Sequence, residues 1–159
     1  MRAQENHSLT SAVVIALACA VTWVFLTQSL YDYNMGFGEI LNLNIFPLLA
    51  WTGGLTLGYI IAEASIKKLK LAPYSLYRPA VVVILYAASV IILETIGYHL
   101  LGIQNIGTSQ YSGIAFCDCL HAPLWMQAGY FALGPLHWLV VRTIIHLRQR
   151  SVDQASSQI

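Results

Sequence analysis

Charged residues are scarce in this chain, which has eight Lys or Arg and seven Asp or Glu among 159 residues, 9% in all. Soluble globular domains carry about 25% charged residues, so most of this chain is not expected to face water. The net charge of +1 gives no basic excess that could bind nucleic acid. The sequence also lacks the motifs of a phosphate-binding loop, a nucleophile elbow or a zinc protease, so it indicates none of these enzyme classes.

Hydrophobic residues make up 57% of the sequence and gather in four runs. About 20 apolar residues are enough to cross the hydrocarbon core of a bilayer. The runs lie at about residues 9–30, 44–66, 79–101 and 123–145, and none has Lys or Arg in its interior. The sequence therefore predicts an all-α fold, a four-helix transmembrane bundle forming one domain at 1–150, followed by a disordered polar tail at 151–159.

The basic residues indicate how these spans are oriented. They fall in the N-terminal tail, in the connection at about 67–78 and near the C-terminal end, whereas the connections 31–43 and 102–122 have none. Because Lys and Arg concentrate on the cytoplasmic side of membrane proteins, we expect both termini on the inner side. We therefore expect a multi-pass protein of the cell membrane, or of the inner membrane in a prokaryote, with connections 31–43 and 102–122 facing outward.

Small residues recur at four-residue spacing in three of the runs. The second run has Gly54 and Gly58, the first has Ala12, Ala16 and Ala20, and the fourth has Ala128 and Ala132. Lipid does not drive helices together, so such stripes stabilise a bundle by letting the backbones approach closely. We expect them to pack the helices of one chain, and a homo-oligomer formed through the same glycines is the alternative.

Glu94 interrupts an otherwise apolar run. A carboxylate inside a membrane span costs about 2.5–3.5 kcal/mol on insertion scales, so it is expected to face the bundle interior and to have a partner. Two interpretations follow: Glu94 is a proton donor or acceptor, or it is a hydrogen-bonded carboxylate that holds neighbouring helices together. Gln127 lies at a similar depth in the fourth run and could donate a hydrogen bond to it.

Two thiols, a carboxylate and an imidazole stand within residues 117–121, directly before the fourth run. One interpretation is a zinc or copper site, because these metals bind thiolate and imidazole ligands. Its ligands would be Cys117, Cys119 and His121. A second is thiol redox chemistry, because a disulfide between cysteines so close in sequence is strained and easily reduced. The third, which we favour, gives the thiols no chemical role and assigns acid–base or turn-capping roles to Asp118 and His121.

The outward connection 31–43 adds further polar residues. It lies on the same side as connection 102–122, so the two can meet, and the first could form a wall or lid over a site in the second. His99 and Gln127, near the outer ends of the third and fourth runs, belong to the same region. The candidate substrate-binding residues are Asp32, Asn34, Glu39, His99 and Gln127.

The sequence predicts a small polytopic membrane protein with an ionisable site on the outer leaflet side. Our leading hypothesis is an intramembrane enzyme that performs acid–base chemistry on an apolar or amphipathic substrate such as a lipid, an isoprenoid or a quinone. Glu94 and Asp118 would give and take protons, and His121 would orient or shuttle them. The alternative is a non-catalytic subunit or scaffold of a larger membrane complex, and the third hypothesis is metal or thiol-redox handling by the cysteines.

Overall fold

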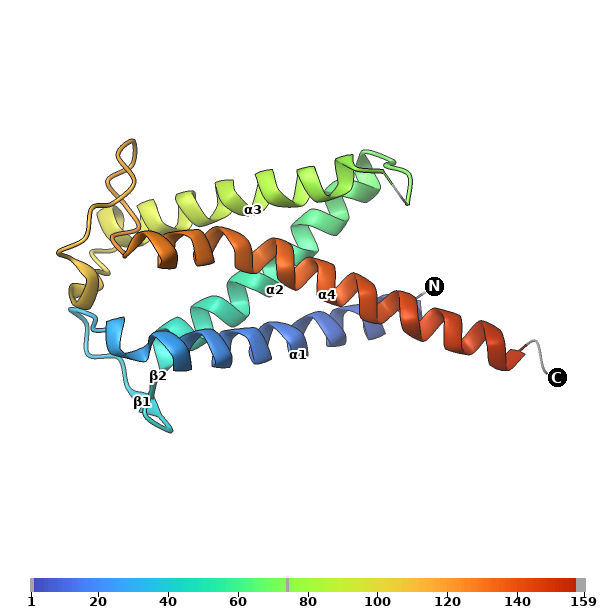
Figure 1. Cartoon of the computed structure of the whole chain (residues 1–159), viewed down its shortest axis with the longest axis horizontal. Helices are drawn as coiled ribbons and strands as arrows, with labels where there is room; N and C mark the ends of the chain where they lie inside the picture. Colours follow the sequence, from blue (N-terminus) through green and yellow to red (C-terminus); the bar gives the residue numbers. More distant parts are fainter. Residues whose placement is uncertain (1, 74, 157–159) are drawn as a thin grey trace.

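The computed structural model describes residues 2–73 and 75–156, and four long α-helices account for most of them. These are α1 (Arg2–Thr27), α2 (Ile45–Lys68), α3 (Tyr77–Thr95) and α4 (Leu124–Ser156) (Figure 1). In the described residues, four stretches are long and apolar enough to cross a membrane: Ser8–Leu30, Ile45–Lys68, Tyr77–Leu100 and Leu124–Ser151. The first and third extend a few residues past the ends of α1 and α3. The predicted all-α fold with four candidate spans is therefore confirmed, and every predicted span matches one of these helices.

Short elements occupy the connections. The first connection holds the 3₁₀ turn η1 (Gln28–Leu30) and an antiparallel pair of two-residue strands, β1 (Glu39–Ile40) and β2 (Leu43–Asn44). A π-helical turn, η2 (Ile96–Leu100), extends α3, and a second 3₁₀ turn, η3 (Ile106–Thr108), follows. The Asn44 side chain accepts a hydrogen bond from Phe46 N at 3.0 Å and so caps the start of α2.

The C-terminal segment differs from the prediction of a disordered tail beginning at residue 151. Helix α4 continues to Ser156, and residues 157–159 lie outside the described residues. Adding a residue to an existing helix needs no new nucleation. Residues 147–156 also include Arg, Gln and Ala, which are good helix formers. The polar segment therefore extends α4 rather than ending it.

Both termini lie at one end of the bundle, together with the connection 69–76 between α2 and α3. The two longer connections, 28–44 and 101–123, lie at the other end, which we call the loop end. Helix α2 runs diagonally, so it is beside α3 at the connection 69–76 and well separated from it at the loop end (Figure 1). Helices α2 and α3 therefore diverge toward the loop end.

Small residues allow the helices to pack closely elsewhere, as the sequence predicts. Ala12, Ala16 and Ala20 of α1 are fully buried. A Cβ added at Gly58 of α2 would lie 3.2 Å from Cδ2 of Tyr86 on α3, so this glycine makes room for the aromatic ring. The alanines of α1 and Gly58 therefore pack inside the same chain, whereas Gly54 has nothing within 4 Å of an added Cβ and lines a cavity.

The outside of the bundle is apolar. Val14, Phe25, Leu49 and Ile84, which belong to α1, α2 and α3, are each more than 60% exposed. Monomeric soluble proteins rarely expose apolar patches larger than a few hundred Å². This surface is compatible with helices that are surrounded by lipid.

Candidate functional site

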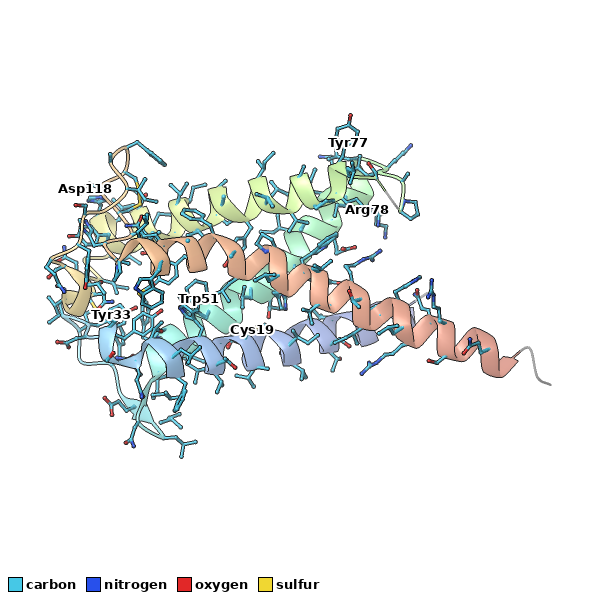
Figure 2. The ribbon with its side chains drawn as sticks, in the orientation of Figure 1. Cys19, Tyr33, Trp51, Tyr77, Arg78 and Asp118 are labelled. Atoms are coloured by element: carbon cyan, nitrogen blue, oxygen red, sulfur yellow. A yellow bond between two sulfur atoms is a disulfide. The ribbon has the colours of Figure 1, made fainter. Side chains whose placement is uncertain are left out.

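A cavity of about 430 Å³ lies at the loop end, between α2, α3 and α4. Pockets for small molecules usually measure roughly 300–1,000 Å³, so this cavity is large enough to hold a ligand. Aromatic side chains form much of its wall: Tyr33, Phe46, Trp51, Tyr86, Tyr98 and Tyr130. Figure 2 shows Tyr33 and Trp51 toward this end of the bundle, with Tyr77 and Arg78 at the opposite end.

The rim of the cavity reaches the apolar outer surface. Leu57 of α2 and Leu93 of α3 line the cavity and are 51% and 54% exposed. These two helices diverge at the loop end (Figure 1). These two cavity-lining side chains therefore have the same apolar character as the outside of the bundle.

Glu94, in the last turn of α3, also lines the cavity. Its carboxyl group has no hydrogen bond or ion pair with any residue in the described part of the chain. It is close enough to Tyr33, Tyr86 and Tyr130 to interact electrostatically with their hydroxyl groups. The expected partner from a neighbouring helix is thus not found, and the carboxyl group faces the cavity.

His121 also forms part of the cavity wall. Its ring stacks on Tyr98 with centroids 4.9 Å apart. Nδ1 lies 3.0 Å from the carbonyl oxygen of Tyr111, and Nε2 lies 3.2 Å from that of Asp118. Both ring nitrogens thus contact acceptors of the protein, and a neutral imidazole can donate to only one of them. These contacts make His121 an anchor for the surrounding loop.

Asp118 does not line the cavity. Its side chain is 79% exposed, and its Oδ1 lies 3.5 Å from Nε2 of His121. Figure 2 shows it at the loop end, apart from Tyr33 and Trp51. Of the three predicted catalytic residues, the structure brings Glu94 and His121 to one cavity and leaves Asp118 outside it, with its side chain beside His121.

Cys117 and Cys119 are joined by a disulfide bond. Cys119 is fully buried, and its carbonyl oxygen accepts a hydrogen bond from Ile114 N at 2.8 Å. We call residues 111–121, which this bond and His121 hold together, the disulfide loop. Asp118 and Leu120 have left-handed backbone conformations, with φ of 44° and 58°, which turn Asp118 outward while Leu120 lines the cavity.

The disulfide bears directly on the predicted zinc or copper site. Metals bind the thiolate form of cysteine, and both sulfur atoms are here engaged in a covalent bond. Across residues 2–73 and 75–156, no group of three or more His, Cys, Asp or Glu is arranged to hold a metal ion. A site that uses Cys117, Cys119 and His121 would therefore require reduction of the disulfide and rearrangement of the loop.

The connections 28–44 and 101–123 meet at the loop end, as expected for two connections on the same side of the bundle. The backbone nitrogen of Asn34 donates to the carbonyl oxygen of Gln104 at 3.0 Å, and Tyr33 pairs with Asn105. The side chain of Asn34 also accepts from Gln104 N at 3.0 Å and donates to Gly102 O at 2.8 Å. Asn34 therefore joins the connections, while Tyr33 and Asn105 line the cavity.

The remaining predicted binding residues lie off the cavity wall. Asp32 and Glu39 are exposed on the surface of their connection. Nε2 of His99 lies 2.9 Å from the carbonyl oxygen of Cys117, at the disulfide loop. Gln127 donates to the carbonyl oxygens of Ser112 and Ala122, at 3.0 and 2.9 Å. Gln127 therefore does not bond to Glu94, because nearby carbonyl groups take its donors.

A cluster of aromatic residues beside the cavity is absent from the sequence prediction. The indole nitrogens of Trp23 and Trp51 each donate to the hydroxyl oxygen of Tyr31 at 3.0 Å, and the Tyr130 hydroxyl lies 3.2 Å from the same atom. We call these four residues the Tyr31 cluster. Burial raises the pKa of Tyr31 and of Tyr33 above the ordinary value, so both phenols keep their protons at neutral pH.

One pattern in the sequence could have predicted this cluster. Trp23, Trp51 and Tyr130 each lie at the same end of their spans as Tyr31. Tyr and Trp at such positions usually form an interfacial belt that faces lipid. Buried Tyr and Trp need hydrogen-bond partners, so four of them at matched depth can also form an internal network.

No protein-family model, curated protein or solved structure matches this chain.

Proposed function

We propose that this chain is a multi-pass integral membrane protein with both termini on the inner side and the loop end at the outer leaflet. The apolar exterior of the bundle and the four long apolar helices support the membrane assignment. The distribution of basic residues supports the orientation, because Lys and Arg are absent from both connections at the loop end.

The proposed activity is acid–base chemistry on an apolar or amphipathic substrate, such as a lipid, an isoprenoid or a quinone. The observation that carries this proposal is the carboxyl group of Glu94, which faces a cavity and has no protein partner among the described residues. Ionisable groups inside membrane spans are costly and are usually paired or functional. Since Glu94 is not paired, a role toward a ligand accounts for it best.

The residues of the site take different roles in this proposal. Glu94 is the catalytic residue, which takes a proton from the substrate or gives one to it. His121 is a positioning residue, because both of its ring nitrogens contact carbonyl oxygens of the disulfide loop. Asp118 acts only through His121. Asn34, His99 and Gln127 hold the connections that cover the cavity.

The substrate would reach Glu94 from the bilayer. Leu57 and Leu93 at the rim are apolar and about half exposed, 51% and 54%, so an apolar chain can rest between α2 and α3. The polar end of the substrate then meets Glu94 inside, while its body stays in lipid. Such a route needs no soluble domain.

A product search across several lipid classes tests this function. Purified protein in lipid nanodiscs is incubated with a mixture of isoprenoid alcohols, quinones and glycerolipids, and the extract is analysed by mass spectrometry. We expect a species that forms with the wild type and with the control Glu39→Gln, whose side chain is exposed away from the cavity, but not with Glu94→Gln.

Two results would contradict the proposal. Equal conversion by Glu94→Gln would remove Glu94 from the chemistry. The absence of any conversion, together with stoichiometric co-purification of another membrane protein, would instead favour a non-catalytic subunit of a larger complex.

A further inference from the structure

The hydrogen bonds of the Tyr31 cluster determine where one further hydrogen can point. A hydroxyl oxygen has two lone pairs, and an indole nitrogen can only donate. Trp23 and Trp51 both donate to Tyr31, so they fill both lone pairs of its oxygen. The hydroxyl oxygen of Tyr130, 3.2 Å away, can then accept a hydrogen bond from the Tyr31 hydroxyl. The Tyr130 hydroxyl cannot donate in return, because the Tyr31 oxygen has no free lone pair.

The hydroxyl hydrogen of Tyr130 is consequently without an acceptor among the described residues. Tyr130 is only 7% exposed and lines the cavity. The hydroxyl of Tyr86 is in a similar position: the residue is 6% exposed, lines the cavity and has no hydrogen bond to a described residue. The hydroxyl hydrogens of Tyr130 and Tyr86 and the free carboxyl group of Glu94 are therefore available together to a ligand in the cavity.

The chemistry of these three groups restricts the ligand. No Lys or Arg lines the cavity, so a phosphate or carboxylate would meet Glu94 without any compensating positive charge. An ammonium group would suit Glu94, but it has no lone pair to accept from Tyr130 or Tyr86. An alcohol fits all three, because its oxygen accepts two hydrogen bonds and donates one.

We propose that the cavity binds the hydroxyl group of an amphipathic alcohol, with Tyr130 and Tyr86 donating to its oxygen and Glu94 facing its O–H group. The apolar chain leaves between Leu57 and Leu93 into the bilayer. This inference deepens the proposed function and rests on it for the role of Glu94. It narrows the substrate class to long-chain alcohols, such as isoprenoid alcohols.

A series of probes that share one chain and differ in the head group tests the inference. Farnesol, farnesyl phosphate and farnesylamine are titrated into the protein in nanodiscs, and binding is followed by tryptophan fluorescence, since Trp51 forms part of the cavity wall. We expect farnesol to bind at least about 10-fold more tightly than either charged analogue, because each of those leaves a donor or a charge without a partner.

Three tyrosine variants separate a binding role from a structural one. Tyr130→Phe and Tyr86→Phe should each weaken farnesol binding by about 3- to 10-fold, the effect of one lost hydrogen bond. Tyr86→Phe removes no hydrogen bond to a described residue, so the test stands even if Tyr130→Phe fails to fold. Tyr59→Phe is the matched control, because its hydroxyl lies off the cavity and bonds to Ser8 at 2.8 Å; its affinity should equal that of the wild type.

The inference is overturned if farnesyl phosphate or farnesylamine binds as tightly as farnesol, if no probe binds, or if both cavity tyrosine variants keep wild-type affinity. These outcomes are separate from those that test the enzyme. Tyrosine-dependent farnesol binding without any Glu94-dependent product would support the alcohol site and contradict the enzyme. Glu94-dependent conversion of a lipid that is not an alcohol would support the enzyme and contradict the alcohol site.

Discussion

Two glutamates lie within the candidate spans, and the structure gives them opposite surroundings. Glu63 of α2 accepts a hydrogen bond from the indole nitrogen of Trp138 at 2.8 Å and lies 3.5 Å from a guanidinium nitrogen of Arg142. Glu94 of α3 has no such partner among the described residues. Replacing each by glutamine removes one negative charge and changes the side-chain volume very little, so the two variants are matched.

The expected losses follow from these contacts. Glu63→Gln loses an ion pair whose side chains are 37% and 28% exposed, and partly exposed pairs contribute about 0.2–1 kcal/mol. It also turns a charge-assisted hydrogen bond from Trp138 into a neutral one, at a cost of about 1 kcal/mol. The free energy of unfolding should therefore fall by about 1–2 kcal/mol in Glu63→Gln. It should be unchanged or higher in Glu94→Gln, because no protein contact is lost there.

The free energy of unfolding can be measured in mixed micelles, with increasing dodecyl sulfate and far-ultraviolet circular dichroism as the readout. A difference of about 1–2 kcal/mol changes the ratio of folded to unfolded protein roughly 5- to 30-fold, which such a titration resolves. If Glu94→Gln lost as much stability as Glu63→Gln, Glu94 would be a structural carboxylate, and the argument that it serves a ligand would fail.

Two further predictions concern packing and the disulfide loop. A Cβ added at Gly129 would lie 2.7 Å from Cζ3 of Trp23 and closer still to Cη2, whereas nothing lies within 4 Å of one added at Gly53. Replacing either glycine by alanine raises the helix propensity by a similar amount. Gly129→Ala should therefore be less stable than Gly53→Ala by about 1–3 kcal/mol, the usual cost of overpacking. Equal stability of the two variants in the same micelle titration would refute the close packing. Of the three cysteines, Cys19 is the free one. Unfolded protein should therefore bind one maleimide before reduction and three after it by intact mass, and three before reduction would show that the disulfide is absent.

The helices could be predicted from the sequence because their signal is local. Each span is a run of about 20 apolar residues, and such a run forms a helix in lipid whatever its neighbours are. Glu94 was recognisable for the same reason, since a single acidic residue stands out in an apolar run. Its environment was not predictable: Gln127, the partner expected from its position in the fourth run, bonds to the carbonyl oxygens of Ser112 and Ala122 instead.

The connections show most clearly where prediction from sequence ends. Asp118 and His121 are neighbours in the sequence, yet only His121 lines the cavity, because left-handed turns at Asp118 and Leu120 send successive side chains to different sides. In the π-helical turn η2, Tyr98 lines the cavity while the next residue, His99, contacts the disulfide loop. Backbone conformations of this kind depend on contacts with distant segments.

Hydropathy and charge are properties of single segments, so the amino-acid sequence was enough to predict four apolar helices, their order and the separation of basic residues from the loop end. Which polar groups meet is a property of the folded bundle. The hydroxyl of Tyr31 bonds to residues 8, 20 and 99 positions away, and the cavity that Glu94 lines lies between α2, α3 and α4. Such contacts depend on how the helices cross, and no single segment encodes the crossing.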